Sequence, residues 1–222
     1  MRAVWDKIGE RYYETGTDQG MLYPIQSDGT FSAGVPWSGL TGVSLTPSGA
    51  ESNAFYADNI KYLTLLSAED LGGTITSYAY PTEFSECDGS AEIEEGVYVG
   101  QQARKIFGLA YRTIIGNDVK SNDYGYKLHL LYNALASPSE RSYQTVNESP
   151  EPMEFSWEFT TTPVDITATL DGKKLKPTAI IEIDSRKVDV AKLEALEDVL
   201  YGSADKEPRL PLPDEVLTIL GK

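Results

Sequence analysis

The chain has 222 residues, and its 34 acidic residues outnumber its 19 basic residues, which gives a formal net charge of -15. This excess repels nucleic acid phosphates, so the composition excludes a protein that wraps DNA, although DNA could slide past such a surface. The single cysteine, Cys87, excludes an intrachain disulfide, and the chain shows neither a signal peptide nor a window of about 18 apolar residues, so we expect a soluble protein outside the membrane.

The N-terminal part is predicted to contain an arm, a hairpin and a loop. Residues 1–9 are mainly polar and form the arm, while residues 10–25, ERYYETGTDQGMLYPI, place two strand-like runs around the turn GTDQG. Residues 26–40, QSDGTFSAGVPWSGL, combine Asp-Gly with a further glycine and a proline, which predicts a long loop. Its large apolar side chains are expected to dock either on the parent core or on a partner.

The next part alternates polar and apolar residues, as strands with one solvated face do. The pattern predicts strands within residues 41–47, 60–66 and 72–81. The stretch AFYADN, residues 54–59, mixes aromatic rings with an acid and an amide, and we interpret it as a hairpin corner, not a reactive site. The segment PTEFSECDG begins with proline and continues with acids, which predicts one helical turn.

Two further hairpins follow. Residues 97–118 carry contact-forming side chains on both sides, which predicts a central strand, and residues 125–136 form its partner across GNDVKSND. Residues 153–164, MEFSWEFTTTPV, show the clearest alternation of a half-buried strand. The dipeptide Asp171-Gly172 marks the tip of the second hairpin.

The C-terminal part contains the clearest helical pattern. Apolar residues at spacings of three and four predict a helix at about residues 189–201, ended by Gly202, and residues 203–222 are predicted to form a second arm. About ten strands with short turns and one late helix predict a mainly β fold. We expect one domain, residues 1–222, built as an antiparallel β-sandwich or half-open barrel with one flanking helix.

Few residues are candidates for chemistry. His129 is the only histidine, and we interpret it as an ordinary sheet residue because no orienting partner is recognisable near it in sequence. Cys87 lies beside Glu86 and Asp88, which should raise the pKa of its thiol and disfavour a nucleophile. One cysteine and one histidine exclude a structural zinc site, and the loop from Asp88 fails the calcium-loop pattern at its sixth and twelfth positions. We therefore expect no enzyme and no catalytic, cofactor-binding or metal-binding residues.

Charge is segregated along the sequence. No basic residue lies between Lys61 and Arg104, whereas this interval holds eight acidic residues. A solvated rim is the common outcome of such a run. A negative surface facing a polyanion or a basic partner would arise if the acids shared one face.

Several stretches in a fixed order resemble the major tail proteins, the tail tube subunits, of long-tailed bacteriophages. In chain order they are FYADN, ECDGSAEI, GQQARKIFGLAYRT, GND, GYKLHLLYNALASPSE, FSWEFTTTPV, KLEALEDVLYG and LPLPDEV. They span about residues 40–217, and their order and co-occurrence make the resemblance specific although each motif is weak alone.

The resemblance implies a fold and an assembly. The fold is two antiparallel sheets packed as a sandwich or half-open barrel with a flanking helix. Six subunits form a ring with a continuous inner barrel, and rings stack into a tube whose acidic lumen conducts DNA without binding it specifically. The implied partners are further copies of the chain, a tape-measure protein and the tail-terminator and tail-tip proteins. The implied location is the virion, after assembly in the host cytoplasm, with no membrane contact.

Stacking of rings requires exposed contact groups, because a head-to-tail contact that does not close yields a filament. The candidate inter-ring contacts are the large apolar side chains of the predicted arm and loop, Trp5, Ile8, Phe31, Val35 and Trp37.

Two other functions are compatible with the sequence. The 14 tyrosines and 3 tryptophans would suit a β-sandwich binding module for host-surface or carbohydrate recognition, because flat rings stack on sugars. An enzyme built on carboxylates, such as a glycosidase, is the third possibility.

Overall fold

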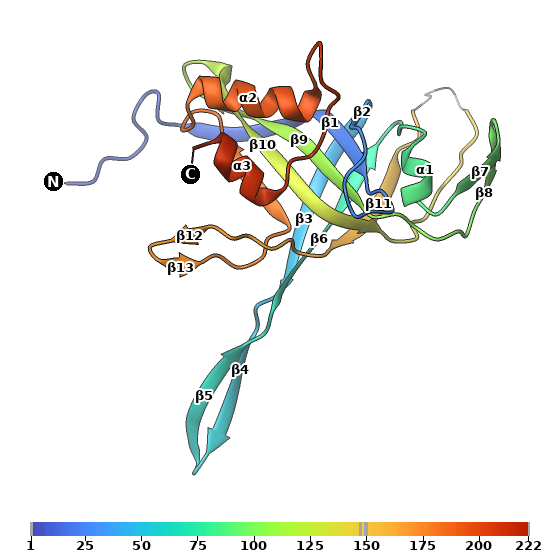
Figure 1. Ribbon diagram of the computed structural model, residues 1–222. Coiled ribbons are helices and arrows are strands. Elements are labelled where there is room, and N and C mark those ends of the chain that lie inside the picture. The colour runs from blue at the N-terminus through green and yellow to red at the C-terminus, as the bar shows by residue number, and fades with distance from the viewer. Residues whose placement is uncertain (1, 147, 149–150, 222) are drawn as a thin grey trace.

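The computed structural model describes residues 2–146, 148 and 151–221, and most of its regular elements are antiparallel strands (Figure 1). The described helices are α1 (Phe84–Cys87), α2 (Val190–Tyr201) and α3 (Pro213–Ile219). The strands of the main sheet are β1 (Tyr12–Pro24), β2 (Val35–Trp37), β3 (Leu40–Gly49), β6 (Glu69–Ser77), β9 (Phe107–Asn117), β10 (Ser121–Ala136), β11 (Phe155–Thr161) and β14 (Ile180–Asp184). Two-stranded hairpins outside this sheet are β4 (Ser52–Ala57) with β5 (Ile60–Leu66), β7 (Ala91–Glu94) with β8 (Val97–Val99), and β12 (Thr169–Leu170) with β13 (Lys173–Lys174).

The main sheet curls on itself. Its strands follow the order β2-β1-β9-β10-β11-β6-β3, and β14 pairs with β10 beside this path. Residues 127–131 of β10 pair with β14, whereas residues 134–136 pair with β11. The path closes back on itself, because a Cβ placed on Gly20 of β1, the strand next to one end, would lie 3.1 Å from the side chain of Leu40 of β3 at the other end. The predicted half-open barrel is therefore confirmed.

An aromatic core fills the inside of the barrel. Its centre is Trp157 of β11, whose ring meets Trp37 at 5.9 Å and Phe84 at 5.0 Å between centroids, both edge-on. The predicted alternation of β11 is confirmed, since Trp157 and Phe159 are buried while Glu158 between them is exposed. Burial of these large rings stabilises this part of the molecule.

Helices α2 and α3 cover the opposite face of β1, β9 and β10, where a second core forms (Figure 1). The buried residues of α2 are Leu193, Leu196 and Leu200, at the three- and four-residue spacing that predicts this helix. Asp189 caps the helix by accepting hydrogen bonds from the backbone N–H groups of residues 191 and 192. The predicted flanking helix is thus confirmed, together with the reason for its placement.

The predicted hairpin corners are confirmed by their backbone angles. Asp58 and Asn59 join β4 to β5 with φ of 51° and 64°, so AFYADN ends in a two-residue turn of the kind that hairpins favour. Asp171 and Gly172 join β12 to β13 with φ of 51° and 75°. The predicted pairing of β9 with β10 is also present, and β9 is central because β1 pairs with its other edge.

The hairpin predicted for residues 10–25 is wrong. These residues contain the single strand β1, which pairs with β9 throughout and shows irregularities between Thr15 and Thr17 and between Asp18 and Met21. Gly16 and Gln19 take positive φ of 67° and 49° there, so the extra residues are absorbed as bulges. The turn-like composition of GTDQG reflects these bulges and not a reversal of the chain.

The long loop predicted for residues 26–40 is also only partly correct. It contains β2, which pairs with residues 20–22 of β1, and an isolated bridge joins Ile25 to Phe31. The segment therefore folds back onto the end of β1. Where its apolar side chains are buried, they dock on the parent core, which is the first of the two predicted alternatives.

The C-terminal segment, residues 203–222, was expected to form an arm, and its described part packs on the body. Leu210 and Val216 are buried in the second core, and the hydroxyl of Tyr132 donates to the carbonyl of Pro211 at 3.0 Å. Residues 213–219 form α3, which begins with a proline, as the first turn of a helix tolerates. Apolar residues of α3 dock it on the second core.

The acidic run between Lys61 and Arg104 is divided among three places. Its members lie at the start of β6, around α1 and on the β7–β8 hairpin, which projects from the barrel (Figure 1). Two of the acids near α1 are neutralised, since Glu86 pairs with Lys105 and Asp88 with Arg141. The run therefore does not form one negative face within the described chain.

Candidate assembly site

The two edges of one part of the sheet have no strand partner among the described residues. We call this part the four-strand segment: residues 12–19 of β1, 112–117 of β9, 121–131 of β10, and β14. Strand β2 covers only residues 20–22 of the outer edge of β1, and β14 pairs only with β10. Unpaired edges of this kind are templates for strand addition.

The backbone of β14 offers hydrogen-bonding groups to its open edge. The backbone N–H of Ser185 donates to the carbonyl of Tyr126, and the backbone N–H of Tyr132 donates to the carbonyl of Ala179. The hydrogen-bonded pairs of β10 and β14 therefore fall on alternate residues. By this alternation, Ile181 and Ile183 bond to β10, while the backbone N–H of Glu182 points away from it. This group is free to pair with a strand of another molecule.

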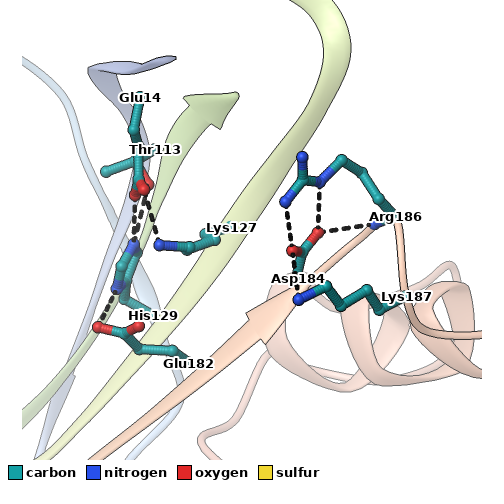
Figure 2. A network of polar contacts seen from close by, with 8 residues as sticks. All are labelled: Glu14, Thr113, Lys127, His129, Glu182, Asp184, Arg186 and Lys187. Carbon is teal, nitrogen blue, oxygen red and sulfur yellow. Dashed lines mark hydrogen bonds and ion pairs between the residues drawn. The ribbon is translucent and has the colours of Figure 1, made fainter. Parts of the chain in front are cut away.

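One face of the four-strand segment carries a polar network (Figure 2). Glu14 lies at its centre and accepts hydrogen bonds from Lys127 at 2.7 Å and from the hydroxyl of Thr113 at 2.5 Å. Burial raises the pKa of Glu14, but these two hydrogen bonds outweigh that effect, so the pKa is lowered and the carboxylate is ionised at neutral pH.

His129 is buried between carboxylates from the two edge strands (Figure 2). Its Nε2 lies 2.9 Å from the Thr113 hydroxyl and 3.8 Å from Glu14 of β1, and its Nδ1 lies 3.6 Å from Glu182 of β14. Burial lowers the pKa of His129, and the charges of Glu182 and Glu14 oppose that effect only in part. The imidazole is therefore neutral at neutral pH.

The network continues beyond β14 to Arg186. Its guanidinium donates two hydrogen bonds to Asp184, which lower the pKa of that carboxyl to about 2. The same guanidinium lies 5.3 Å from the ring centroids of Tyr12 and Tyr124, so it reaches across the sheet. Gly125 makes room for this crossing, because a Cβ there would lie 2.7 Å from the Arg186 side chain.

Charge is balanced within the network of Figure 2. Its acids are Glu14, Glu182 and Asp184, and its bases are Lys127, Arg186 and Lys187. The neutral His129 adds no charge. This face of the subunit is therefore polar and nearly neutral, and not the strongly acidic surface that the resemblance implies for a lumen.

A second exposed feature is the β4–β5 hairpin, residues 52–66, which we call the hairpin arm. It projects far from the barrel, and every one of its strand residues is exposed (Figure 1). Ile60, Leu63 and Leu65 lie on one side of β5, because the pairing with β4 shifts register between Phe55 and Tyr56, and their exposed fractions reach 63%. An isolated hairpin is marginally stable in water, so we expect a partner to pack on this apolar arm and bury it.

The candidate inter-ring residues are not brought together in one subunit. Trp5 and Ile8 lie on the N-terminal segment, whose described residues 2–9 form no helix or strand, and they are 78% and 82% exposed. Phe31 is partly buried against the second core, and Val35 is partly buried within β2. These positions agree with outward contacts for the first two residues only.

Trp37 is a core residue, which corrects its prediction as a surface contact. Its side chain is 3% exposed, and its indole N–H lies 3.1 Å from the hydroxyl of Ser77 and 3.0 Å from the carbonyl of Ala79. The loop composition concealed the short strand β2, which turns this side chain toward Trp157. Trp37 therefore stabilises the subunit and is not available to a neighbour.

The residues considered for chemistry lie apart. Burial, with a smaller contribution from Glu86, raises the pKa of the Cys87 thiol to about 12, so the direction predicted from the neighbouring acids is confirmed and burial is the larger cause. The segment considered as a calcium loop forms the β7–β8 hairpin, in which Glu92 accepts a hydrogen bond from the backbone of Gly96. Within the described ranges, no group of three or more His, Cys, Asp or Glu residues could hold a metal ion.

A cleft of about 1060 Å³ lies between the end of β1, α1 and the β7–β8 hairpin. Its charged lining residues are Glu83, Glu86, Glu92, Arg104 and Lys105. Lys105 pairs with Glu86, and Arg104 donates to the backbone carbonyl of Asp88. The cleft therefore presents mixed charge and no convergent set of groups for one ligand.

The polar network was missed because its members are distant in sequence. Glu14 and Lys127 are 113 positions apart, and the carboxylates that β1 and β14 bring to His129 lie too far from it in sequence to be recognised as its partners. A local signal was present. In KLH and IEID, polar residues alternate with Leu128 and Ile183 of the second core, which marks one polar side on each strand.

No helix among residues 2–146, 148 and 151–221 is long and apolar enough to cross a membrane.

Comparison with known proteins finds a distant likeness among solved structures. No protein-family model matches the chain, and no curated protein matches its sequence. The chain is similar to a chain of the cryo-EM structure of an extracellular contractile injection system, the PVC sheath–tube complex in its extended state. The two share 10% sequence identity over 75% of this chain and 88% of that chain, with a TM-score of 0.32. A likeness of this size establishes neither a shared function nor a shared assembly.

Proposed function

We propose that this chain is a structural subunit without catalytic activity, which assembles into hexameric rings that stack as a phage tail tube and conduct DNA. The observation that carries the proposal is the four-strand segment with its two unpaired edges. The tail tube resemblance of the sequence supplies the ring size and the role of the tube.

The number and direction of the strands favour closure through these edges. Strands β1, β9, β10 and β14 are each antiparallel to the next, so β1 and β14 run in opposite directions. When neighbours are related by rotation about an axis along the strands, β14 of one subunit meets β1 of the next as an antiparallel pair. A closed ring would then leave no open edge in the joined sheet.

Coverage of the sheet favours one orientation in the ring. Helices α2 and α3 cover one face of β1, β9 and β10, whereas the polar network of Figure 2 lies on the other. In a ring, the polar face would line the lumen. Its balanced ion pairs would give DNA phosphates no cluster of free cations to bind, because each base is paired with an acid.

Stacking is assigned to the hairpin arm and to the N-terminal segment. Both expose large apolar side chains, and the arm projects away from the barrel (Figure 1). Burying such surface against the next ring is favourable at about 25 cal/mol per Å² of apolar area. This assignment replaces the loop of residues 26–40, whose Trp37 serves the subunit core.

Electron microscopy of concentrated or co-expressed protein tests the proposal, and rings or tubes are the expected result. Proline at position 182 removes an outward N–H and is tolerated at a sheet edge, so Glu182→Pro should prevent ring closure while the subunit stays folded. Glu182→Gln is the matched control, because it changes the side chain and keeps the backbone donor. Wild-type protein that stays monomeric beside its tail partners would contradict the proposal.

The same samples separate this function from a binding module. Selective binding on a glycan array, without self-association at any concentration, would favour host-surface or carbohydrate recognition. Hydrolytic activity lost on changing one Asp or Glu would favour the carboxylate enzyme.

A further inference from the structure

We infer that protonation of His129 controls the interface between subunits and strengthens their association as the pH falls. The inference rests on the proposed assembly and adds its regulation. It starts from the position of His129, which lies against a carboxylate on each of the two edge strands.

The hydrogen bonds around His129 assign its tautomer. The Thr113 hydroxyl donates its one hydrogen to Glu14 at 2.5 Å, so its oxygen accepts from Nε2–H of His129 at 2.9 Å. Nδ1 is then the unprotonated nitrogen. It is buried and has no hydrogen-bond partner, and the Glu182 carboxylate lies 3.6 Å away.

A lone pair that faces a carboxylate is unfavourable, and one proton reverses the interaction. Protonation makes Nδ1 a donor to Glu182 of β14 and leaves Nε2–H on Thr113 of β9, whose hydroxyl donates in turn to Glu14 of β1. The other groups that face His129 are the phenol of Tyr111, which stacks on its ring, and Lys127, whose ammonium is held by Glu14.

Ring closure increases the negative charge beside each edge. Glu14 and Glu182 lie on the same face of the sheet, so pairing β14 with β1 of the next subunit places Glu182 of one copy beside the strand that carries Glu14 of another. Like charges on neighbouring strands repel. A charged His129 in each subunit offsets this repulsion, and the added carboxylates raise the pKa of His129 in the ring.

The direction of the effect follows from proton linkage. The assembled state binds more protons than the free subunit, so association weakens as the pH rises and strengthens as it falls. A rise of one unit in the pKa of His129 on assembly corresponds to an association constant between subunits that is about tenfold higher when His129 is protonated.

Sedimentation velocity between about pH 8 and pH 6, above the usual range of carboxyl groups, tests the inference. We expect wild-type association to tighten as the pH falls through this range, and the full change of about tenfold for one pKa unit is reached only below the pKa of His129 in the free subunit. His129→Gln keeps a donor for Thr113 but cannot be protonated, and its association should not change with pH. Glu182→Gln provides a second variant, since its amide satisfies Nδ1 without a charge, and should behave in the same way.

The single histidine gives an independent measurement. Its Cε1–H resonance reports the protonation of His129 in the free subunit, and Glu182→Gln should lower the midpoint of its titration. Wild-type rings whose stability is independent of pH, or a pH dependence that persists in both variants, would overturn the inference and leave the proposed assembly standing. A chain that stays monomeric throughout the range contradicts the proposed function, and the inference with it.

Discussion

The ring of Tyr111 lies parallel to the ring of His129, at 4.6 Å between centroids and 6° between planes. Tyr111 belongs to the aromatic core of the barrel, and His129 belongs to the polar network. The stacked pair therefore marks the line where the inside of the barrel changes from apolar to polar. On one side of this line the sheet stabilises the subunit, and on the other it carries the groups that we assign to assembly.

Stability of the free subunit should decrease in acid because of His129. Burial lowers the pKa of this residue below its unfolded value of 6.5, so the folded state binds fewer protons. The contribution of the neutral His129 to the free energy of unfolding is present above the unfolded pKa. It is lost as the pH falls toward the folded pKa, by up to about 1.4 kcal/mol per pH unit. Urea unfolding at several pH values measures it. His129→Gln should remove this part of the slope, and an unchanged slope would show that other groups cause it.

Replacing Trp37 with alanine should destabilise the subunit by about 3–5 kcal/mol, because it leaves a cavity in the aromatic core and removes the partner of two polar groups. Denaturant unfolding monitored by circular dichroism measures the loss. Trp5→Ala is the matched control, since this exposed side chain should change stability by less than about 0.5 kcal/mol. A folded Trp37→Ala subunit of wild-type stability would contradict its place in the core.

Gly73→Ala should destabilise the barrel by about 1–3 kcal/mol, the range for an overpacked core. A Cβ at this position would lie 2.2 Å from the carbonyl oxygen of Ser44 and 2.6 Å from the ring of Phe159. The backbone atom cannot move without breaking the pairing of β3 with β6. Gly100→Ala serves as the control, because nothing lies within 4 Å of its added Cβ, and both melting temperatures should be compared with wild type.

The hairpin arm should be needed for stacking but not for folding. Ile60→Ser together with Leu65→Ser removes apolar surface from one side of β5, and the unfolding free energy of the body should change by less than about 1 kcal/mol. Electron microscopy should then show rings without tubes. Leu170→Ser, at an exposed residue of the β12–β13 hairpin, is the control and should leave tubes intact. Normal tubes in the double variant would exclude the arm from the stacking contact.

Deletion of residues 2–9 should also leave the subunit folded, because these residues form no helix or strand and Trp5 and Ile8 are exposed. We expect rings to form and tube growth to fail. Size-exclusion chromatography with light scattering would separate rings from tubes. Tube growth equal to that of wild type would assign stacking to the hairpin arm alone.

Local patterns predicted most of the elements. The two-residue turns at Asp58-Asn59 and Asp171-Gly172, the alternation around Trp157 and the leucine spacing of α2 are each confirmed. These features depend on neighbours within a few positions, where chain geometry links sequence directly to structure. The mainly β fold follows from their sum.

Local patterns failed where a distant partner decides the conformation. GTDQG looks like a turn, yet β9 holds it within one long strand and its extra residues become bulges. The loop around Trp37 looks exposed, yet β1 supplies a partner for β2 and Trp157 a neighbour for the indole. Pairing with distant strands outweighed the local preference in both cases.

The sequence by itself determined the charge balance, the strand and helix periods, the turn positions and the resemblance from which the assembly was inferred. Only the tertiary structure decided which edges stay open and which residues surround His129, because strand order joins residues that are more than 100 positions apart. Side-chain alternation fixes which face a residue occupies, but pairing between strands fixes what it meets there. The candidate assembly site is built from such pairings.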